Sequence, residues 1–289
     1  MPLRTPWCET LGIDVPIVNA PMGGAAGARL AQVVSGAGGL GMVGMGSAAT
    51  PELLTGELRA LSGIERPVGI GLVHWVTQRH PRLLDAALAA GPALLSVSFG
   101  EDWSWVRRAH DAGIRTAGQV GTVAAAHRAV DAGVDVLVAR GAEGGGHGEP
   151  RVATLPLLAE LLDRFDVPVL AAGGISTARG LAAVLAAGAS AGWLGTVFAA
   201  CVEASTPDTA RGALLAADSA DTTLTREFDL QQDYDWPAHI PERVLTDEAG
   251  APTPVNAGQG VGAVSASEPA AEVVARLSRD AEALLRRWC

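Results

Sequence analysis

The 289-residue sequence contains no lysine, so all 21 of its basic residues are arginine. This absence excludes enzymes that work through a lysine Schiff base, and it excludes nucleotide-binding proteins that hold a phosphate with a P-loop lysine. An anion bound by this chain must instead be held by arginine, by backbone N–H groups or by helix N-termini.

Other features are missing as well. Cys8, Cys201 and Cys289 lie far apart, without a CxxC motif or a histidine in metal-ligand spacing, so we expect neither a disulfide framework nor a metal site. There is no signal-peptide core and no apolar run of 18 residues. The net charge of −10 argues against nucleic-acid and membrane partners. Together these absences predict a cytoplasmic protein.

Eight short runs of apolar and small residues recur along the chain, and each is typical of a strand buried on both faces. The runs cover 16–22, 39–46, 67–73, 93–100, 114–121, 134–141, 167–174 and 191–198. Helical patterns follow at 27–37, 51–61, 80–90, 103–112, 122–132, 154–164 and 177–187, with a last one at 268–288. This alternation predicts an α/β fold, a (β/α)8 TIM barrel, with an open doubly wound sheet as the weaker alternative.

The segment 202–266 interrupts the regular spacing. It is rich in Asp, Thr and Pro, and it is too long for an ordinary strand–helix loop. Because it follows the carboxyl end of the eighth strand, where barrel enzymes carry their active sites, we interpret it as a lid or substrate-binding insertion. The predicted organisation is a barrel at 1–201, the lid at 202–266 and a completing helix at 267–289.

Glycines end the seventh and eighth predicted strands, as Gly173-Gly174 and Gly195-Thr196. Strands 7 and 8 form the usual phosphate site of this fold, and glycine leaves backbone N–H groups open to a dianion. Ordinary turn chemistry is the alternative explanation for either pair alone. Two such ends on adjacent strands favour a phosphate site that needs no lysine.

His147 is the strongest candidate for a catalytic side chain. It follows three glycines after the sixth predicted strand, where no helix or strand face requires a histidine. Imidazole titrates near neutral pH and therefore suits proton transfer or the pairing of an anion. His74 also follows a predicted strand and is the second candidate.

Several motifs resemble the nitronate monooxygenase family, formerly called 2-nitropropane dioxygenases. They are APMGG at 20–24, SGAGGLGMVGMG at 35–46, GAEGGGHG at 141–148, AAGGISTARGLAAVLAAGA at 171–189, LGTVF at 194–198, WPAHIPERVL at 236–245 and AGQGVGAV at 257–264. The resemblance covers nearly the whole chain, and its glycine–glycine–histidine loop is the most specific part.

The resemblance implies an FMN-dependent barrel that oxidises nitronates or nitroalkanes with O2 to a carbonyl compound and nitrite. It implies that His147 acts as a base toward a nitroalkane or as the partner of an anionic nitronate. The implied cofactor-binding residues are Ala20, Pro21, Met22, Gly71, Gln119, Arg140, Gly145, Gly146, Gly173, Gly174, Trp193, Leu194, Gly195 and Thr196. We expect the substrate to contact His74, Gln259 and Gly260.

Two positions depart from the family pattern. The family usually has an asparagine where this chain has Gly71, and a glutamine where it has Arg140. Either change removes an amide from the expected flavin site. Arg140 could supply a fixed positive charge to the flavin, or it could turn away and pair with Glu143.

Two other functions remain open. The sister family of flavin-dependent enoyl-acyl-carrier-protein reductases, which use NADH, shares the barrel and the histidine loop. A non-catalytic barrel with a degenerate flavin site would also explain Gly71 and Arg140. The sequence leaves the nitro substrate open, and it leaves open whether the protein forms a homodimer.

Overall fold

The computed structural model describes residues 3–288, and it shows a parallel eight-stranded barrel. The barrel strands are β1 (Ile17–Asn19), β2 (Gly41–Met45), β3 (Val68–Val73), β4 (Leu94–Ser98), β5 (Arg115–Val120), β6 (Val136–Arg140), β8 (Val169–Ala172) and β9 (Ala191–Leu194). Their order is β1-β9-β8-β6-β5-β4-β3-β2, and a single parallel bridge between Val18 and Leu40 joins the two edges. All eight predicted strands are confirmed, as is the (β/α)8 fold class.

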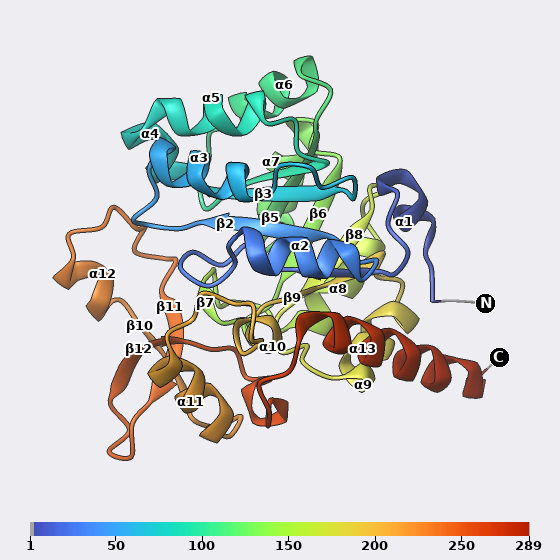
Figure 1. Ribbon diagram of the computed structural model, residues 1–289, viewed down its shortest axis with the longest axis vertical. Helices are drawn as coiled ribbons and strands as arrows, with labels where there is room; N and C mark the ends of the chain where they lie inside the picture. The colour runs from blue at the N-terminus through green and yellow to red at the C-terminus, as the bar shows by residue number, and fades with distance from the viewer. Residues whose placement is uncertain (1–2, 289) are drawn as a thin grey trace.

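Helices connect successive strands on the outside of the barrel (Figure 1). They are α2 (Ala28–Gly36), α3 (Pro51–Ala60), α4 (His74–Arg79), α5 (Pro81–Ala89), α6 (Ser104–Asp111), α7 (Val123–Asp131), α8 (Thr154–Leu162), α9 (Ala178–Ala186), α10 (Thr196–Ala199) and α13 (Ala270–Leu285). Threonine caps three of these helices. Thr50, Thr122 and Thr177 each accept a hydrogen bond from the backbone N–H three residues further on, which satisfies a first-turn donor.

Two apolar layers hold the barrel together. The inner layer consists of strand side chains that point into the barrel, such as Met42, Val138 and Trp193, and it is continued by the short helix α1 (Pro6–Leu11). The outer layer lies between the strands and the surrounding helices. In Figure 1, α1 lies at one end of the barrel and the lid elements lie at the other.

The segment 202–266, which we call the lid segment, forms its own small sheet. Its elements are α11 (Asp208–Ala216), β10 (Thr222–Thr225), α12 (Glu227–Gln231), β11 (Glu242–Thr246), β12 (Pro252–Asn256) and the 3-10 helix η1 (Val261–Ala263). A two-residue strand from the barrel side, β7 (Gly146–His147), joins this sheet and pairs antiparallel with β11. The sequence pattern gave no sign of β7, which attaches the loop after β6 to the lid segment.

A second 3-10 helix, η2 (Arg286–Trp288), follows α13 at the end of the described residues. Cys8 and Cys201 are buried free thiols, and Cys289 lies outside the described residues. A search of residues 3–288 finds no helix with the length and apolar character needed to cross a bilayer.

Candidate functional site

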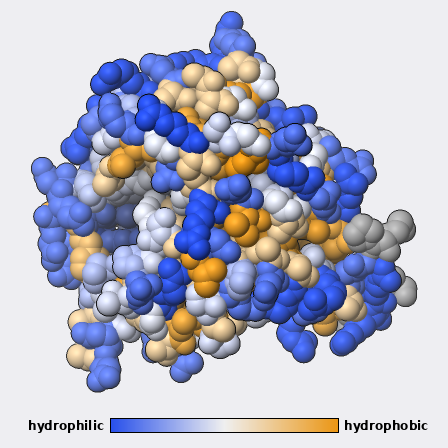
Figure 2. Space-filling view, viewed as in Figure 1, coloured by the Kyte–Doolittle hydropathy of each residue, from blue (hydrophilic) through white to orange (hydrophobic). Residues whose placement is uncertain are grey.

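A cavity of about 630 Å3 opens at the carboxyl ends of β3 to β6, under the lid segment. Figure 2 shows the molecule hollowed on the side where the lid meets the barrel. Three residues expected at the site line this cavity, namely His74, Gln119 and Arg140. Aromatic rings from Trp75, Phe99 and Trp103 make up part of its wall. A cavity of this size and mixed lining is typical of a small-molecule site.

His147 stands beside this cavity, and two lid residues hold its ring. Its Nε2 lies 2.9 Å and 3.1 Å from the two carboxylate oxygens of Asp229, which comes from α12. The indole of Trp236 stacks on the imidazole with a centroid distance of 3.5 Å and an interplanar angle of 3°. Trp236 is itself anchored, because its Nε1 donates to Ser47 Oγ at 3.0 Å. The ring of His147 is therefore fixed in both position and tilt.

Burial sets the protonation of this histidine. The loss of water around the ring lowers the pKa of His147, although the hydrogen bond and the charge of Asp229 act in the opposite direction. A neutral imidazole with a carboxylate at Nε2 carries its proton on Nε2, which leaves the lone pair of Nδ1 available. The arrangement is that of a base oriented by a carboxylate.

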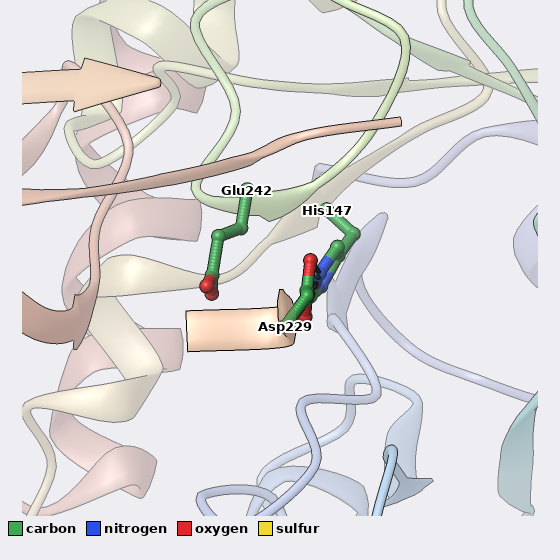
Figure 3. Close-up of side chains that lie close together, drawn as sticks. All are labelled: His147, Asp229 and Glu242. Atoms are coloured by element: carbon green, nitrogen blue, oxygen red, sulfur yellow. Dashed lines mark hydrogen bonds and ion pairs between the residues drawn. The ribbon is translucent and has the colours of Figure 1, made fainter. Parts of the chain in front are cut away.

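A second carboxylate faces the same pair. Glu242 is the cross-strand partner of His147 between β11 and β7, and its side chain is only 6% exposed. Figure 3 shows Glu242 and Asp229 reaching toward the same space beside the imidazole. Burial, reinforced by the charge of Asp229, raises the pKa of Glu242 to about 7.

Arg140 binds the histidine loop and forms no ion pair with Glu143. Its guanidinium is buried and donates to three consecutive carbonyl oxygens of the histidine loop, those of Gly144 at 2.8 Å, Gly145 at 3.1 Å and Gly146 at 2.9 Å. Glu143 is occupied elsewhere, since its carboxylate accepts from the backbone N–H and the hydroxyl of Thr154. Burial lowers the pKa of Arg140 to about 10, so the group stays charged at neutral pH.

Close packing explains why several positions of this loop are glycine. A Cβ on Gly148 would lie 2.2 Å from Cζ of Arg140, and one on Gly145 would lie 2.5 Å from the backbone nitrogen of Gly258. Gly146 has a φ of +64°, in the left-handed region that favours glycine. The loop is therefore shaped around the Arg140 side chain, and His147 follows directly from it.

Close packing also explains why position 71 is a glycine. A Cβ there would lie 2.3 Å from Cβ and Cγ of Pro21, whose ring covers the β3 backbone. An asparagine side chain has no room at this position in this chain. The glycine at position 71, where the family usually has asparagine, therefore depends on the position of Pro21 in the neighbouring loop after β1.

The ends of β8 and β9 keep unused hydrogen-bond donors. Within residues 3–288, the backbone N–H groups of Gly174, Ile175 and Gly195 donate to no protein atom. Thr196 begins α10, so its N–H also has no helical acceptor. These N–H donors fit a phosphate group, as expected from the glycines at the two strand ends. The donors belong to the backbone, so the site needs no side-chain cation.

One lid loop joins this end of the barrel to the histidine loop. Gly258 donates to Thr196 Oγ1 at 3.0 Å, and the Gln259 N–H donates to the Glu143 carbonyl at 2.9 Å. Gly260 packs against the backbone of Gly174, where a Cβ would lie 2.7 Å from the carbonyl oxygen. The Gln259 side chain is exposed.

The remaining expected residues take different positions. Trp193 and Leu194 are buried in β9, so only their backbone atoms are available. The Met22 sulfur lies close to Gly195, and Ala20 is half-buried beside the inner core. Gln119 Nε2 donates to Ser98 Oγ at 2.9 Å at the cavity wall.

The sequence did not predict three of the residues around His147, namely Asp229, Trp236 and Glu242. Asp229 lies 82 residues from His147 in an ordinary amphipathic segment, EFDLQ, with no local signal. Trp236 and Glu242 belong to the WPAHIPERVL motif, which supported the resemblance but assigned no role to either residue. Only the folding of the lid segment brings these residues to the histidine.

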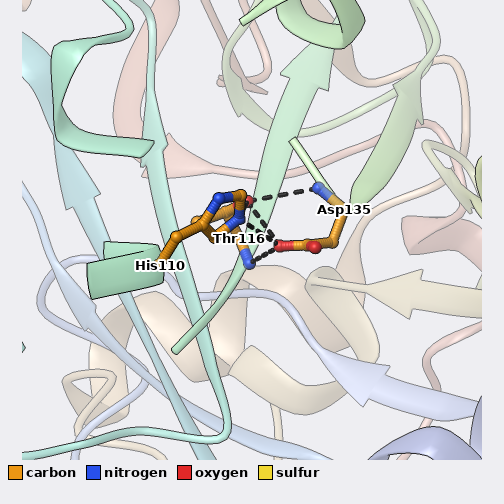
Figure 4. A network of polar contacts seen from close by, with 3 residues as sticks. All are labelled: His110, Thr116 and Asp135. Atoms are coloured by element: carbon orange, nitrogen blue, oxygen red, sulfur yellow. Dashed lines mark hydrogen bonds and ion pairs between the residues drawn. The ribbon is translucent and has the colours of Figure 1, made fainter. Parts of the chain in front are cut away.

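A second histidine–aspartate contact lies away from this site. His110 Nε2 lies 2.9 Å from Asp135 Oδ2, and the same oxygen accepts from the backbone and hydroxyl of Thr116, as Figure 4 shows. Asp135 precedes β6 and Thr116 lies early in β5, so this network joins the strand entrances. Burial acts to raise the pKa of Asp135, but the hydrogen bonds from His110 and Thr116 outweigh it, and the net shift is downward. The network is structural.

Comparison with protein families gives a match to the model described as nitronate monooxygenase, over residues 4–82 and 71–233. A nitronate monooxygenase of Paraburkholderia phytofirmans is 33% identical over 261 residues, with 74% of this chain and 71% of the relative covered. Another relative is the (3aS,4S,5R,7aS)-5-hydroxy-7a-methyl-1-oxo-octahydro-1H-indene-4-carboxyl-CoA dehydrogenase of Rhodococcus jostii. It is 32% identical over 246 residues, with 85% of this chain and 67% of the relative covered.

Solved structures share the whole architecture. FabK from Thermotoga maritima superposes with a TM-score of 0.88 at 25% identity and covers 99% of this chain and 98% of its own. Nitroalkane oxidase from Streptomyces ansochromogenes superposes with a TM-score of 0.83 at 28% identity, with 98% of this chain and 100% of that chain covered. Both similarities include the lid segment as well as the barrel.

Proposed function

The chain belongs to the nitronate monooxygenase family and is an oxidoreductase, and we propose that it uses FMN to oxidise nitronates or nitroalkanes with O2. The products would be a carbonyl compound and nitrite. A bound flavin would supply the electron acceptor for this oxidation.

The unused donors at the β8 and β9 ends are the residues we assign to the cofactor phosphate. The N–H groups of Gly174, Ile175, Gly195 and Thr196 offer several donors on adjacent strands without a lysine. Gln119, held by Ser98 at the cavity wall, is the amide side chain available to the flavin ring. Arg140 organises the histidine loop beside the same cavity.

The single observation that carries the proposal is the buried Asp229–His147 pair at the carboxyl end of the barrel. With its pKa lowered, the imidazole is neutral at pH 7, and Asp229 directs the ring proton to Nε2. Nδ1 can then take the α-proton of a neutral nitroalkane. When that proton is transferred, the Asp229 carboxylate stabilises the imidazolium that forms.

Trp236 supports the same role by excluding water. It covers one face of the imidazole and makes edge contacts with Phe99 and Trp75 at centroid distances of 5.1 Å and 6.0 Å. An aromatic wall of this kind leaves an apolar space for the alkyl part of a substrate and keeps the base desolvated.

The test is an anaerobic titration of the purified, flavin-loaded protein with a small alkyl nitronate, followed by its visible flavin absorbance. We expect the absorbance to fall on addition of nitronate and to return when air is admitted, with release of nitrite. His147→Asn should keep the flavin but lose turnover of neutral nitroalkanes by about 100-fold or more. His127→Asn, at an exposed position on α7, is the matched control. An unchanged spectrum with every nitronate would refute the substrate assignment.

A second candidate is the oxidation or reduction of an acyl thioester. The Rhodococcus jostii relative acts on a carboxyl-CoA, by its name, and it is 32% identical over 85% of this chain. Rapid loss of the flavin absorbance with NADH in the absence of nitronate, followed by recovery on adding an enoyl thioester, would favour this candidate over the first.

A further inference from the structure

His147, Asp229 and Glu242 together have the composition of a metal site. Each offers one ligand atom, and these three atoms all lie within 4.8 Å of one another. One imidazole nitrogen and two carboxylate oxygens are a ligand set typical of divalent transition metals such as Zn2+ and Mn2+. Three protein ligands also leave coordination positions open.

The backbone places two of these ligands side by side. His147 and Glu242 are directly opposed in the β7–β11 pair, and opposed residues project from the same face of a sheet. Asp229 approaches from α12, and Figure 3 shows its carboxylate beside the imidazole. Three separate elements thus converge on one point, which local sequence spacing could not reveal.

One carboxylate oxygen at this point is unsatisfied, whereas both Asp229 oxygens lie within hydrogen-bond distance of His147 Nε2 and Glu242 also has a hydrogen bond with Asn256. Glu242 Oε1 is buried and has no hydrogen-bond partner, although its residue is only 6% exposed. Asp229 is 3% exposed. Within the described chain, neither carboxylate forms an ion pair with an arginine, and the only charged-group partner is the imidazole itself. Buried carboxylates are normally paired with a cation or bound to a metal, and a divalent cation would satisfy the free oxygen of Glu242.

We propose that His147, Asp229 and Glu242 bind one divalent transition-metal ion. The ion would take the place of the proton between His147 Nε2 and Asp229, and Glu242 Oε1 would complete the three ligands. With the metal at Nε2, the neutral imidazole would carry its proton on Nδ1 and would have no lone pair left to act as a base, so the ion would act as an inhibitor of the enzyme. Only this last consequence rests on the proposed function.

The experiment measures binding without substrate. The full-length protein, stripped with a chelator that is then removed, is titrated calorimetrically with Zn2+ alone and with Mn2+ alone. We expect one ion per chain in the wild type, and a Kd raised by about 100-fold or more in Glu242→Gln because one of three ligands loses its charge. Glu248→Gln, an exposed position on the same hairpin, should bind like the wild type.

A second measurement keeps the outcome independent of how the variant folds. The electron paramagnetic resonance signal of wild-type protein with one equivalent of Mn2+ should show coupling to an imidazole nitrogen. The proposal is overturned by the absence of stoichiometric binding, by an affinity in Glu242→Gln within about threefold of the wild type, or by bound Mn2+ without nitrogen coupling. Activity is not read in either measurement, so a failed nitronate assay leaves both results interpretable.

Discussion

Replacing Arg140 by leucine should destabilise the loop that carries His147. The guanidinium donates to the carbonyls of Gly144, Gly145 and Gly146 at 2.8 to 3.1 Å, and it is 6% exposed. Each carbonyl left without a donor costs about 1–3 kcal/mol, and the lower end applies because parts of the loop can reach water. Three carbonyls therefore predict a loss of about 3 kcal/mol in the free energy of unfolding.

The assays are urea unfolding and thermal unfolding of the purified protein, both followed by circular dichroism. A loss of about 3 kcal/mol corresponds to a decrease of roughly 6 °C in Tm for a protein of this size. Arg140→Gln, which keeps one amide donor group, should lie between leucine and the wild type. Arg107→Leu is the control, because the Arg107 side chain is 90% exposed and its removal should change stability by less than about 0.5 kcal/mol.

The Arg140 series also tests the assignment of the loop to catalysis. If the arginine only fills space, leucine should restore most of the packing and the unfolding free energy should change by less than about 1 kcal/mol. That result would refute the view that Arg140 holds the loop through its carbonyls. A destabilised variant that still turns over nitroalkanes at the wild-type rate would instead show that the position of His147 does not depend on the clamp.

Three further predictions concern single contacts. Asp229→Asn should lower kcat/KM for neutral nitroalkanes by about 100-fold and shift the acidic limb of its pH profile to lower pH, since His147 loses the charged partner that raises its pKa; an unchanged pH profile would remove Asp229 from the mechanism. Gly71→Ala should destabilise by about 1–3 kcal/mol in urea unfolding because its Cβ meets a proline ring at 2.3 Å, whereas Gly56→Ala, in an open helical position, should stabilise by about 0.5–1 kcal/mol. Asp135 has a lowered pKa, so its stabilising contribution is present above its unfolded pKa and is lost as the pH falls through its folded pKa; Asp135→Asn should flatten the acid limb of the stability–pH curve, and an equally steep limb would contradict this.

Much of the barrel could be predicted because its signals are local. Each of the eight apolar runs is a strand, and each main helical pattern from 27–37 to 268–288 is a helix. At the start of one of these helices the Thr50 hydroxyl accepts from the Leu53 N–H. Such signals involve only a few neighbouring residues, because the apolar pattern of a buried strand and the capping of a helix both depend on residues close together in the sequence.

The prediction of His147 also came from local sequence, since a histidine after three glycines at a strand end has few packing explanations. The residues that contact His147 could not be predicted in this way. The contacts of Asp229 and Glu242 with the imidazole depend on how α12 and β11 fold back over the barrel. The sequence separation of 82 residues between His147 and Asp229 carries no pattern that would reveal this pairing.

By itself, then, the sequence determined the fold class and the family resemblance, and it predicted the histidine loop and a phosphate site without lysine. Only the tertiary structure revealed the contacts of the two residues that depart from the family pattern. Arg140 binds loop carbonyls, and Gly71 makes room for the Pro21 ring. It also decided that two buried carboxylates meet one imidazole. The physical reason is that secondary structure follows from neighbouring residues, whereas the environment of a buried charge depends on every element that packs against it.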